Sequence, residues 1–219
     1  MPEDLTSIKD KLRIYNPWWY DDKWYEKDQN LADFRGSVLK VKPRLFYHIT
    51  QNITAPRYGI VTIRGPRRAG KTTLLKLVID HLIRERKVDP SSIFYISLDY
   101  QGLKEVELVE ILEIIANSSD SEKYIFLDEV SMYRDWALAL KNVYDMGLVE
   151  RAKLKIIATG SHSMDLAEAV SKLRNRQGSL AGGFNLGGNL IHRTLRFSEV
   201  IEALKPEIDD ELRTSGLRK

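Results

Sequence analysis

The sequence predicts an α/β protein with three layers, in which a parallel sheet is covered by helices on both faces. Short apolar runs without polar alternation recur along the chain, as expected of strands that are buried on both sides. Segments with apolar residues at helical spacing lie between these runs, so strands and helices alternate. With 219 residues, 43% of them hydrophobic, the chain is long enough for one full domain and a smaller appendage.

Residues 1–57 are predicted to form an arm ahead of the main domain. Residues 1–13 are polar and are expected to be mobile. Aromatic rings then gather in residues 15–25, which read YNPWWYDDKWY. Because acidic residues lie among these rings and would repel phosphates, we expect the rings to pack against the core. Stacking on single-stranded bases and binding of a partner are the two alternatives.

The main domain is predicted over residues 58–205, and residues 206–219 are predicted to be a polar tail. Apolar runs indicate the strands, and apolar residues three or four positions apart indicate the helices. The predicted strands are 58–64, 93–98, 124–127, 155–158 and 192–197. The predicted helices are 73–86, 106–116, 136–147, 164–173 and a last one capped by Ser198 with Glu199 in its first turn. Of the connections, 45–49 is predicted as a short helix or linker, 52–57 as a turn, and 177–189 as a glycine-rich loop of low order.

A glycine-rich loop follows the first predicted strand and precedes a helix. It reads GPRRAGKT, with four residues between its two glycines and then Lys71 and Thr72, which matches a phosphate-binding template. In that arrangement, backbone N–H groups converge at a helix N-terminus, where negative charge is favoured. We therefore expect a triphosphate here, with Lys71 at its β- and γ-phosphates and the Thr72 hydroxyl on Mg²⁺. The predicted binding residues are Gly65, Pro66, Arg67, Arg68, Ala69, Gly70, Lys71, Thr72 and Thr73; a turn that binds nothing is the alternative.

Two adjacent carboxylates, Asp128 and Glu129, end the third predicted strand. Burial there is costly unless a cation lies opposite, and Mg²⁺ supplies that charge. Asp128 is therefore the predicted metal ligand, and Glu129 the predicted base that orients or deprotonates the attacking water. The alternative is that both acids merely begin the next helix.

The second carboxylate favours hydrolysis over other chemistries of phosphate-binding loops. A GTPase needs an Asn-Lys-x-Asp base reader, which the sequence lacks, and small-molecule kinases usually lack a residue like Glu129. Ser161, in Thr159-Gly160-Ser161 after the fourth strand, is predicted to contact the γ-phosphate or the attacking water. Its alternative role is the N-cap of the following helix.

The bulk composition excludes several classes of function. A net charge of +3, from 34 basic and 31 acidic residues, is too weak to argue for nucleic acid, and the absence of cysteine removes disulfides and thiolate chemistry. The four histidines are scattered without ligand spacing. No run of eighteen apolar residues and no signal peptide is present, so no membrane partner is expected and the cytoplasm is the predicted location.

Several of these stretches together resemble the prokaryotic, largely archaeal, AAA+-type ATPases. They are GPRRAGKTTLL, YIFLDEV followed by Asp135-Trp136, ATGSHS and LRFSEV, and the segment from Tyr15 to Trp19 is similar to the Asn-Pro-Trp-Trp segment of archaeal members. The resemblance covers about residues 14–204. It implies a P-loop NTPase fold with strand order 5-1-4-3-2, ATP with Mg²⁺ as ligands, and a sensor role for Ser161.

The resemblance also implies a catalytic arginine. In many relatives, Leu-Pro-Gly-Arg-Arg-Gly follows the sensor, and here the first of those arginines falls on Arg176 while the second position holds Gln177. Arg176 is expected to reach a neighbour's γ-phosphate, which requires a homo-oligomer. A solvated arginine without a catalytic part and the use of Arg174 instead are the alternatives.

The function predicted from the sequence is Mg²⁺-dependent ATP binding and hydrolysis by an AAA+-type module that acts as a motor or switch. A nucleotide-binding regulatory module with little turnover is the first alternative, favoured because relatives continue into a lid and a further domain while this chain stops at Lys219. An ATP-dependent protein associated with nucleic acid is the second alternative.

Overall fold

The computed structural model describes residues 5–101, 106–161, 171–173, 175–184, 187–205, 208 and 214. Its centre is a five-stranded sheet with the strand order β2-β3-β4-β1-β5. All neighbouring strands are parallel. This is the predicted order 5-1-4-3-2 read from the other edge, so the expected P-loop NTPase arrangement is confirmed. The strands are β1 (Gly59–Arg64), β2 (Ile93–Ser97), β3 (Lys123–Asp128), β4 (Leu154–Gly160) and β5 (Asn189–Ile191).

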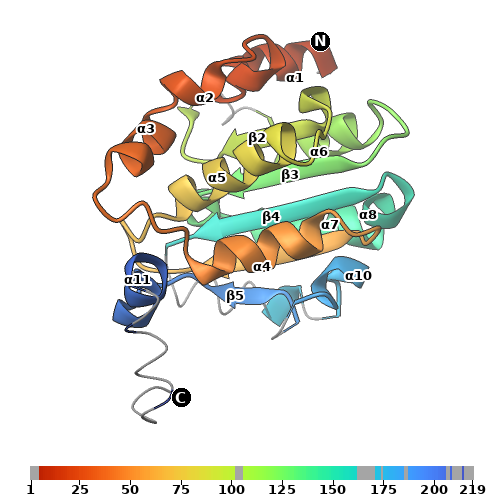
Figure 1. Ribbon diagram of the computed structural model, residues 1–219. Coiled ribbons are helices and arrows are strands. Elements are labelled where there is room, and N and C mark those ends of the chain that lie inside the picture. The colour runs from red at the N-terminus through yellow and green to blue at the C-terminus, as the bar shows by residue number, and fades with distance from the viewer. Residues whose placement is uncertain are drawn as a thin grey trace.

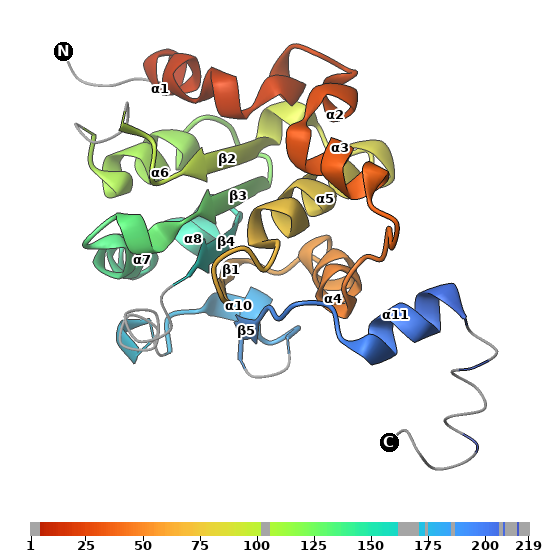
Figure 2. The same ribbon diagram turned by 90° about the vertical axis from the view of Figure 1, so that its left-hand side faces the viewer.

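Helices cover both faces of the sheet, as Figures 1 and 2 show. One face carries α4 (Arg44–Ile53) and α5 (Lys71–Arg84), and the other carries α6 (Leu108–Ala116), α7 (Trp136–Asp145) and α8 (Leu148–Arg151). Successive β3 residues, Ile125 and Phe126, belong to different buried clusters, one on each face. Two-sided burial of this kind explains the unbroken apolar runs of the strands, and the predicted three layers are confirmed.

Residues 5–13 are helical, contrary to the prediction that residues 1–13 are mobile, and residues 1–4 lie outside the described residues. Helix α1 (Leu5–Leu12) buries Ile8 and Leu12 completely, because a spacing of four places both on one helix face. Helix α1 packs beside α6, in the buried cluster on the face of the sheet that α6, α7 and α8 cover. Short helices follow: η1 (Arg13–Tyr15), η2 (Pro17–Trp19), α2 (Trp24–Lys27) and α3 (Gln29–Gly36). In both views these elements run along one side of the sheet (Figures 1 and 2).

The aromatic segment packs against the core, as expected. Trp18 and Trp24 are buried in the cluster that also holds α5, with their rings edge to face at a centroid distance of 5.0 Å. The indole N–H groups of Trp18 and Trp19 donate to the carbonyl oxygen of Ile93 in β2. The arm is thus attached to the edge strand by hydrogen bonds as well as by apolar contact.

Several predicted connections and boundaries differ from the structure, although the helix that was one alternative for residues 45–49 is present. Residues 45–49 belong to the longer helix α4, which also takes in the first part of the predicted turn at 52–57. The expected loop at 177–189 contains α10 (Gly178–Ala181), whose Leu180 is completely buried beside β1. The connections η3 (Pro90–Ser92) and η5 (Val130–Met132) were not predicted. The helix expected at 164–173 falls largely outside the described residues.

The fifth strand ends before the segment predicted for it. β5 ends at Ile191, and although the His192 N–H still donates to the Arg64 carbonyl, the chain then leaves the sheet. Helix α11 (Phe197–Leu204) begins after Arg196, so Ser198 is not its cap. The Glu199 carboxylate accepts from the backbone N–H groups of Arg196 and Arg44, and this contact fixes the start of the helix on α4. No helix within the described ranges is long and apolar enough to cross a membrane.

Candidate functional site

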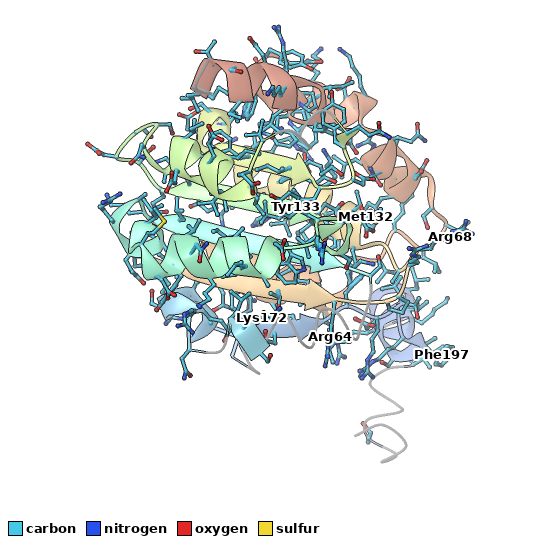
Figure 3. All side chains as sticks on the ribbon, turned by 180° about the vertical axis from the view of Figure 1, so that it is seen from behind. Arg64, Arg68, Met132, Tyr133, Lys172 and Phe197 are labelled. Carbon is cyan, nitrogen blue, oxygen red and sulfur yellow. The ribbon has the colours of Figure 1, made fainter. Side chains whose placement is uncertain are left out.

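The glycine-rich loop connects the carboxyl end of β1 to the first residue of α5. Gly70 has a φ of +84°, in the left-handed region that favours glycine. At Gly65, a β-carbon would lie 2.3 Å from the His192 carbonyl oxygen, so only glycine lets these two backbones meet. Arg67 and Arg68 are exposed, and Figure 3 shows Arg68 at the outer edge of the molecule. The two glycines are thus required by the shape of the loop.

Lys71 is buried and lies across the loop. Its ammonium donates to the carbonyl oxygens of Gly65 (3.1 Å) and Pro66 (2.8 Å). Burial lowers the pKa of Lys71 from its usual value, and the nearby carboxylates of Glu129 and Asp128 partly oppose that shift. The ammonium is thus held by two carbonyl groups of the loop itself.

Asp128 ends β3 and is 2% exposed. Its Oδ2 accepts from the Thr72 hydroxyl and the Tyr95 hydroxyl, each at 2.7 Å. Its Oδ1 accepts from the Thr159 hydroxyl and from the backbone N–H of Glu129. The predicted metal pair, Thr72 and Asp128, is thus in direct contact, although 56 positions separate the two residues along the chain.

Glu129 has a φ of +51°, an uncommon conformation for a residue with a side chain. The Ser161 hydroxyl donates to its carboxylate, at 3.1 Å from Oε1 and 3.0 Å from Oε2. Strain of this kind is often found at functional sites, where the surrounding contacts hold it in place. The structure thus brings Ser161 onto Glu129 at the end of the sheet that carries the loop.

The oxygen donors here suit Mg²⁺, which is usually bound through one or two carboxylates, waters and substrate phosphates. Thr72 and Asp128 present a hydroxyl oxygen and a carboxylate oxygen 2.7 Å apart. Within the described ranges, no group of three or more His, Asp or Glu side chains could hold a metal by itself. A hard cation shared with phosphate oxygens therefore fits, and an all-protein cage does not.

Arg176 lies away from the loop. Its Nε is 2.6 Å from Asp145 Oδ1, at the end of α7. The next residue, Gln177, accepts from the Ile60 N–H near the start of β1, whereas the loop follows the end of that strand. A six-residue strand spans about 20 Å, so Arg176 cannot reach the loop of its own chain.

His192 is a site residue that the sequence analysis missed, because the four histidines were judged only by metal-ligand spacing. It is 4% exposed, and its Nε2 lies 2.7 Å from the Ala69 carbonyl oxygen in the loop. Since a carbonyl only accepts, Nε2 carries the proton. Its position directly after β5, at the same sheet edge as the loop, is the sequence signal that could have indicated it.

Two cavities flank His192. The smaller, about 140 Å³, lies against Ala69, Gly70 and Thr73 and is walled by apolar side chains that include Phe34 and Leu77. The larger, about 580 Å³, lies between α4 and the segment after β5. Its lining includes Arg44, Tyr47, His48, Arg193 and Arg196. The loop thus opens on one side into a mixed apolar and basic hollow.

Comparison with known proteins gives a family match and one similar curated sequence. A family model described as an AAA domain matches residues 57–182, more than half of the chain. A protein of Methanocaldococcus jannaschii, described as uncharacterized, is 33% identical over 150 residues, which are 66% of this chain and 28% of that protein. The chain therefore spans less than a third of the length of this relative.

Solved structures resemble this chain more distantly. The ORC1 protein of Aeropyrum pernix in complex with DNA has a TM-score of 0.48 and 13% identity, covering 83% of this chain and 50% of that one. Domain III of the Thermotoga maritima replication initiation protein DnaA has a TM-score of 0.44 and 16% identity, covering 79% and 68%. PCH-2 of C. elegans has a TM-score of 0.45 and 15% identity, covering 79% and 48%.

The contact of His192 with the loop predicts a pH dependence of stability. Burial lowers the pKa of His192 below its ordinary 6.5, and the hydrogen bond to Ala69 only partly opposes this. As the pH falls below about 6.5, the unfolded chain therefore binds a proton that the folded chain resists, and the free energy of unfolding falls. We expect His192→Gln to reduce this loss between pH 7.5 and pH 5, measured by denaturant unfolding. An equal reduction in the control His48→Gln would show that His192 is not its source.

Proposed function

Since this chain belongs to the AAA-domain family and is a nucleotide-binding ATPase module, we propose that it binds ATP with Mg²⁺ and hydrolyses it to ADP and phosphate, as a motor or switch. The contact of the Thr72 hydroxyl with the Asp128 carboxylate, at 2.7 Å, supports this most directly. It joins the loop to the acidic strand end, as binding and hydrolysis of one triphosphate require. A cytoplasmic location is part of the proposal.

The phosphates would lie at the N-terminus of α5. The first N–H groups of a helix have no partner within the helix, and the helix dipole favours an anion there. Lys71 now donates to two loop carbonyls, and we propose that it exchanges them for phosphate oxygens. The Thr72 hydroxyl and Asp128 would hold Mg²⁺, which neutralises phosphate charge when bound.

Glu129 would act as the base. Its carboxylate accepts the proton of a water molecule, the water oxygen bonds to the γ-phosphorus, and the bond from that phosphorus to the bridging oxygen breaks. ADP leaves with the electron pair of that bond. The two contacts from Ser161 fix the carboxylate for this role, and the γ-phosphate would draw the hydroxyl toward itself.

The hollow beside His192 is our proposed site for the base and ribose of ATP. It starts at Ala69 and Gly70 of the loop and has an apolar wall at Phe34 and Leu77. Apolar walls with a few polar groups are typical of sites for small ligands. Arg193 lines both cavities and would face the ribose or the base.

Lys71→Ala is expected to abolish ATP binding and leave the fold intact, because the ammonium's hydrogen bonds to described residues go to loop carbonyls. The measurement is a calorimetric titration with a non-hydrolysable ATP analogue and Mg²⁺, with far-UV circular dichroism to check the fold. Arg67→Ala is the matched control: it removes an exposed side-chain charge from the same loop but keeps the backbone N–H through which Arg67 is expected to bind phosphate, so it should leave most of the affinity. Unchanged affinity in Lys71→Ala would refute the proposed phosphate site.

Glu129→Gln keeps the shape and deletes the base, so we expect turnover to fall roughly 10²- to 10⁴-fold while nucleotide binding stays within about twofold. Phosphate release should be measured with and without DNA, which also tests an association with nucleic acid. The exposed Glu150→Gln is the control and should hydrolyse at the parent rate. If the parent binds ATP but shows no turnover above Glu129→Gln, the protein is a nucleotide-binding regulatory module.

Arg176 is proposed to act on a neighbouring subunit, since it lies at the far end of β1 from its own loop. Its contribution to transition-state charge would be roughly 10³- to 10⁵-fold in rate. Arg176→Ala and Lys71→Ala proteins should each be inactive alone and regain part of the activity when mixed, measured as phosphate release. Full activity of Arg176→Ala alone would remove the residue from the mechanism. If the two proteins associate but regain no activity, action between subunits is ruled out.

A further inference from the structure

Tyr95, in the edge strand β2, contacts the candidate metal ligand Asp128 through its side chain and the N-terminal arm through its backbone. Its ring is buried in the cluster beside α5, and its hydroxyl donates to Oδ2 of Asp128 at 2.7 Å. The Thr72 hydroxyl donates to the same oxygen. Burial, and then the Asp128 carboxylate, raise the pKa of Tyr95 well above its usual value. A phenol with its ordinary pKa of about 10 is protonated at neutral pH, so this hydroxyl is a donor.

The backbone of Tyr95 is held by one side chain of the arm. Asn16 has no exposed surface, and its amide Nδ2 donates to the Tyr95 carbonyl oxygen at 2.8 Å. Its Oδ1 accepts from the Tyr95 N–H at 2.6 Å. Because β2 is an edge strand, this side chain takes the place that the backbone of a sixth strand would have at this residue.

Lys76 holds the Tyr95 ring between the arm and α5. Its ammonium lies 4.1 Å from the centroid of the Tyr95 ring and 4.9 Å from that of Trp18. It also pairs with Asp28 at 3.6 Å and donates to the Tyr15 carbonyl at 3.3 Å. Lys76 thus joins the helix that starts at the phosphate loop to three parts of the arm.

We propose that the arm positions the metal-binding carboxylate: Asn16 fixes Tyr95, and the Tyr95 hydroxyl fixes Asp128 for Mg²⁺. The proposal rests on the proposed function. Thr72 would share its hydroxyl oxygen with Mg²⁺, so Tyr95 would supply a side-chain donor to Oδ2 that is not itself a metal ligand. Partners of this kind orient the ligands of a metal, and their loss typically costs 10- to 100-fold in affinity. Tyr95 is a positioning residue in this role.

The chain offers a matched control in Tyr124. It is a buried tyrosine in the adjacent strand β3, and its hydroxyl donates to another carboxylate, Glu122, at 3.1 Å. Its pKa is likewise raised by burial. Tyr124 is the second residue of the strand that Asp128 ends. Tyr95→Phe and Tyr124→Phe therefore each delete the hydroxyl of one buried tyrosine, and only the first touches the proposed metal site.

The experiment measures how much Mg²⁺ each full-length variant needs to bind a non-hydrolysable ATP analogue. We expect Tyr95→Phe to raise the half-saturating Mg²⁺ concentration about tenfold, while the affinity measured without Mg²⁺ stays at the parent value. Tyr124→Phe should leave both quantities unchanged. Equal Mg²⁺ requirements in Tyr95→Phe and the parent would overturn the inference, as would an equal rise in both variants.

Two arm variants test the first step of the proposal. Asn16→Ala should raise the Mg²⁺ requirement in the same direction and speed hydrogen exchange at the Tyr95 amide. Trp19→Phe, which loses a hydrogen bond to Ile93 but spares Tyr95, should do neither. If Asn16→Ala fails to fold, Asn16→Asp keeps the acceptor and loses the donor, and the same shift is expected. A parent-like Mg²⁺ requirement in the folded variant would overturn the role of the arm.

The outcomes separate the inference from the proposed function. A parent protein that binds no nucleotide with or without Mg²⁺ would overturn both. The inference alone is overturned by a different result. In that case the parent binds the analogue with Mg²⁺ and Lys71→Ala does not, but Tyr95→Phe needs the same Mg²⁺ concentration as the parent.

Discussion

The buried carboxylate of Asp128 is the interaction on which the rest of this structure depends. A carboxylate removed from water is costly unless hydrogen-bond donors replace the water. Here the donors come from α5, β2 and β4, through Thr72, Tyr95 and Thr159, and from the backbone N–H of Glu129. One side chain therefore fixes the phosphate loop and both neighbours of β3 in a single arrangement. A shift of any of these elements would cost a buried oxygen one of its two donors.

The parts of the site that follow from local sequence were predictable. The loop with Lys71 and Thr72 was expected because glycine spacing, a strand before it and a helix after it are all contiguous in the chain. Asp128 and Glu129 were expected because two acids at the tip of an apolar strand need a cation nearby. The carboxyl ends of parallel strands share one edge of the sheet, so the loop and these acids had to meet.

The parts that depend on contacts between distant residues were not predictable. Asn16 and Tyr95 are 79 positions apart, and His192 and Ala69 are 123 apart, so no window of sequence contains either pair. A weaker signal did exist for Tyr95, since a tyrosine inside an unbroken apolar strand needs a partner for its hydroxyl. The spacing of Ile8 and Leu12 was likewise a helical signal, obscured by the polar residues around it. The end of β5 and the start of α11 could not be predicted either, because they depend on where the chain leaves the sheet at His192.

The contacts between the arm and β2 also affect how this protein behaves among its own copies. The outer strand of a sheet presents unpaired N–H and C=O groups that invite a strand from another molecule. On β2, the Asn16 amide occupies both groups of Tyr95, and two indoles occupy the carbonyl of Ile93. The opposite edge is the three-residue strand β5, too short to be a good template. The arm therefore protects the sheet against edge-to-edge aggregation, and chains whose arm has not yet docked are those most exposed to it.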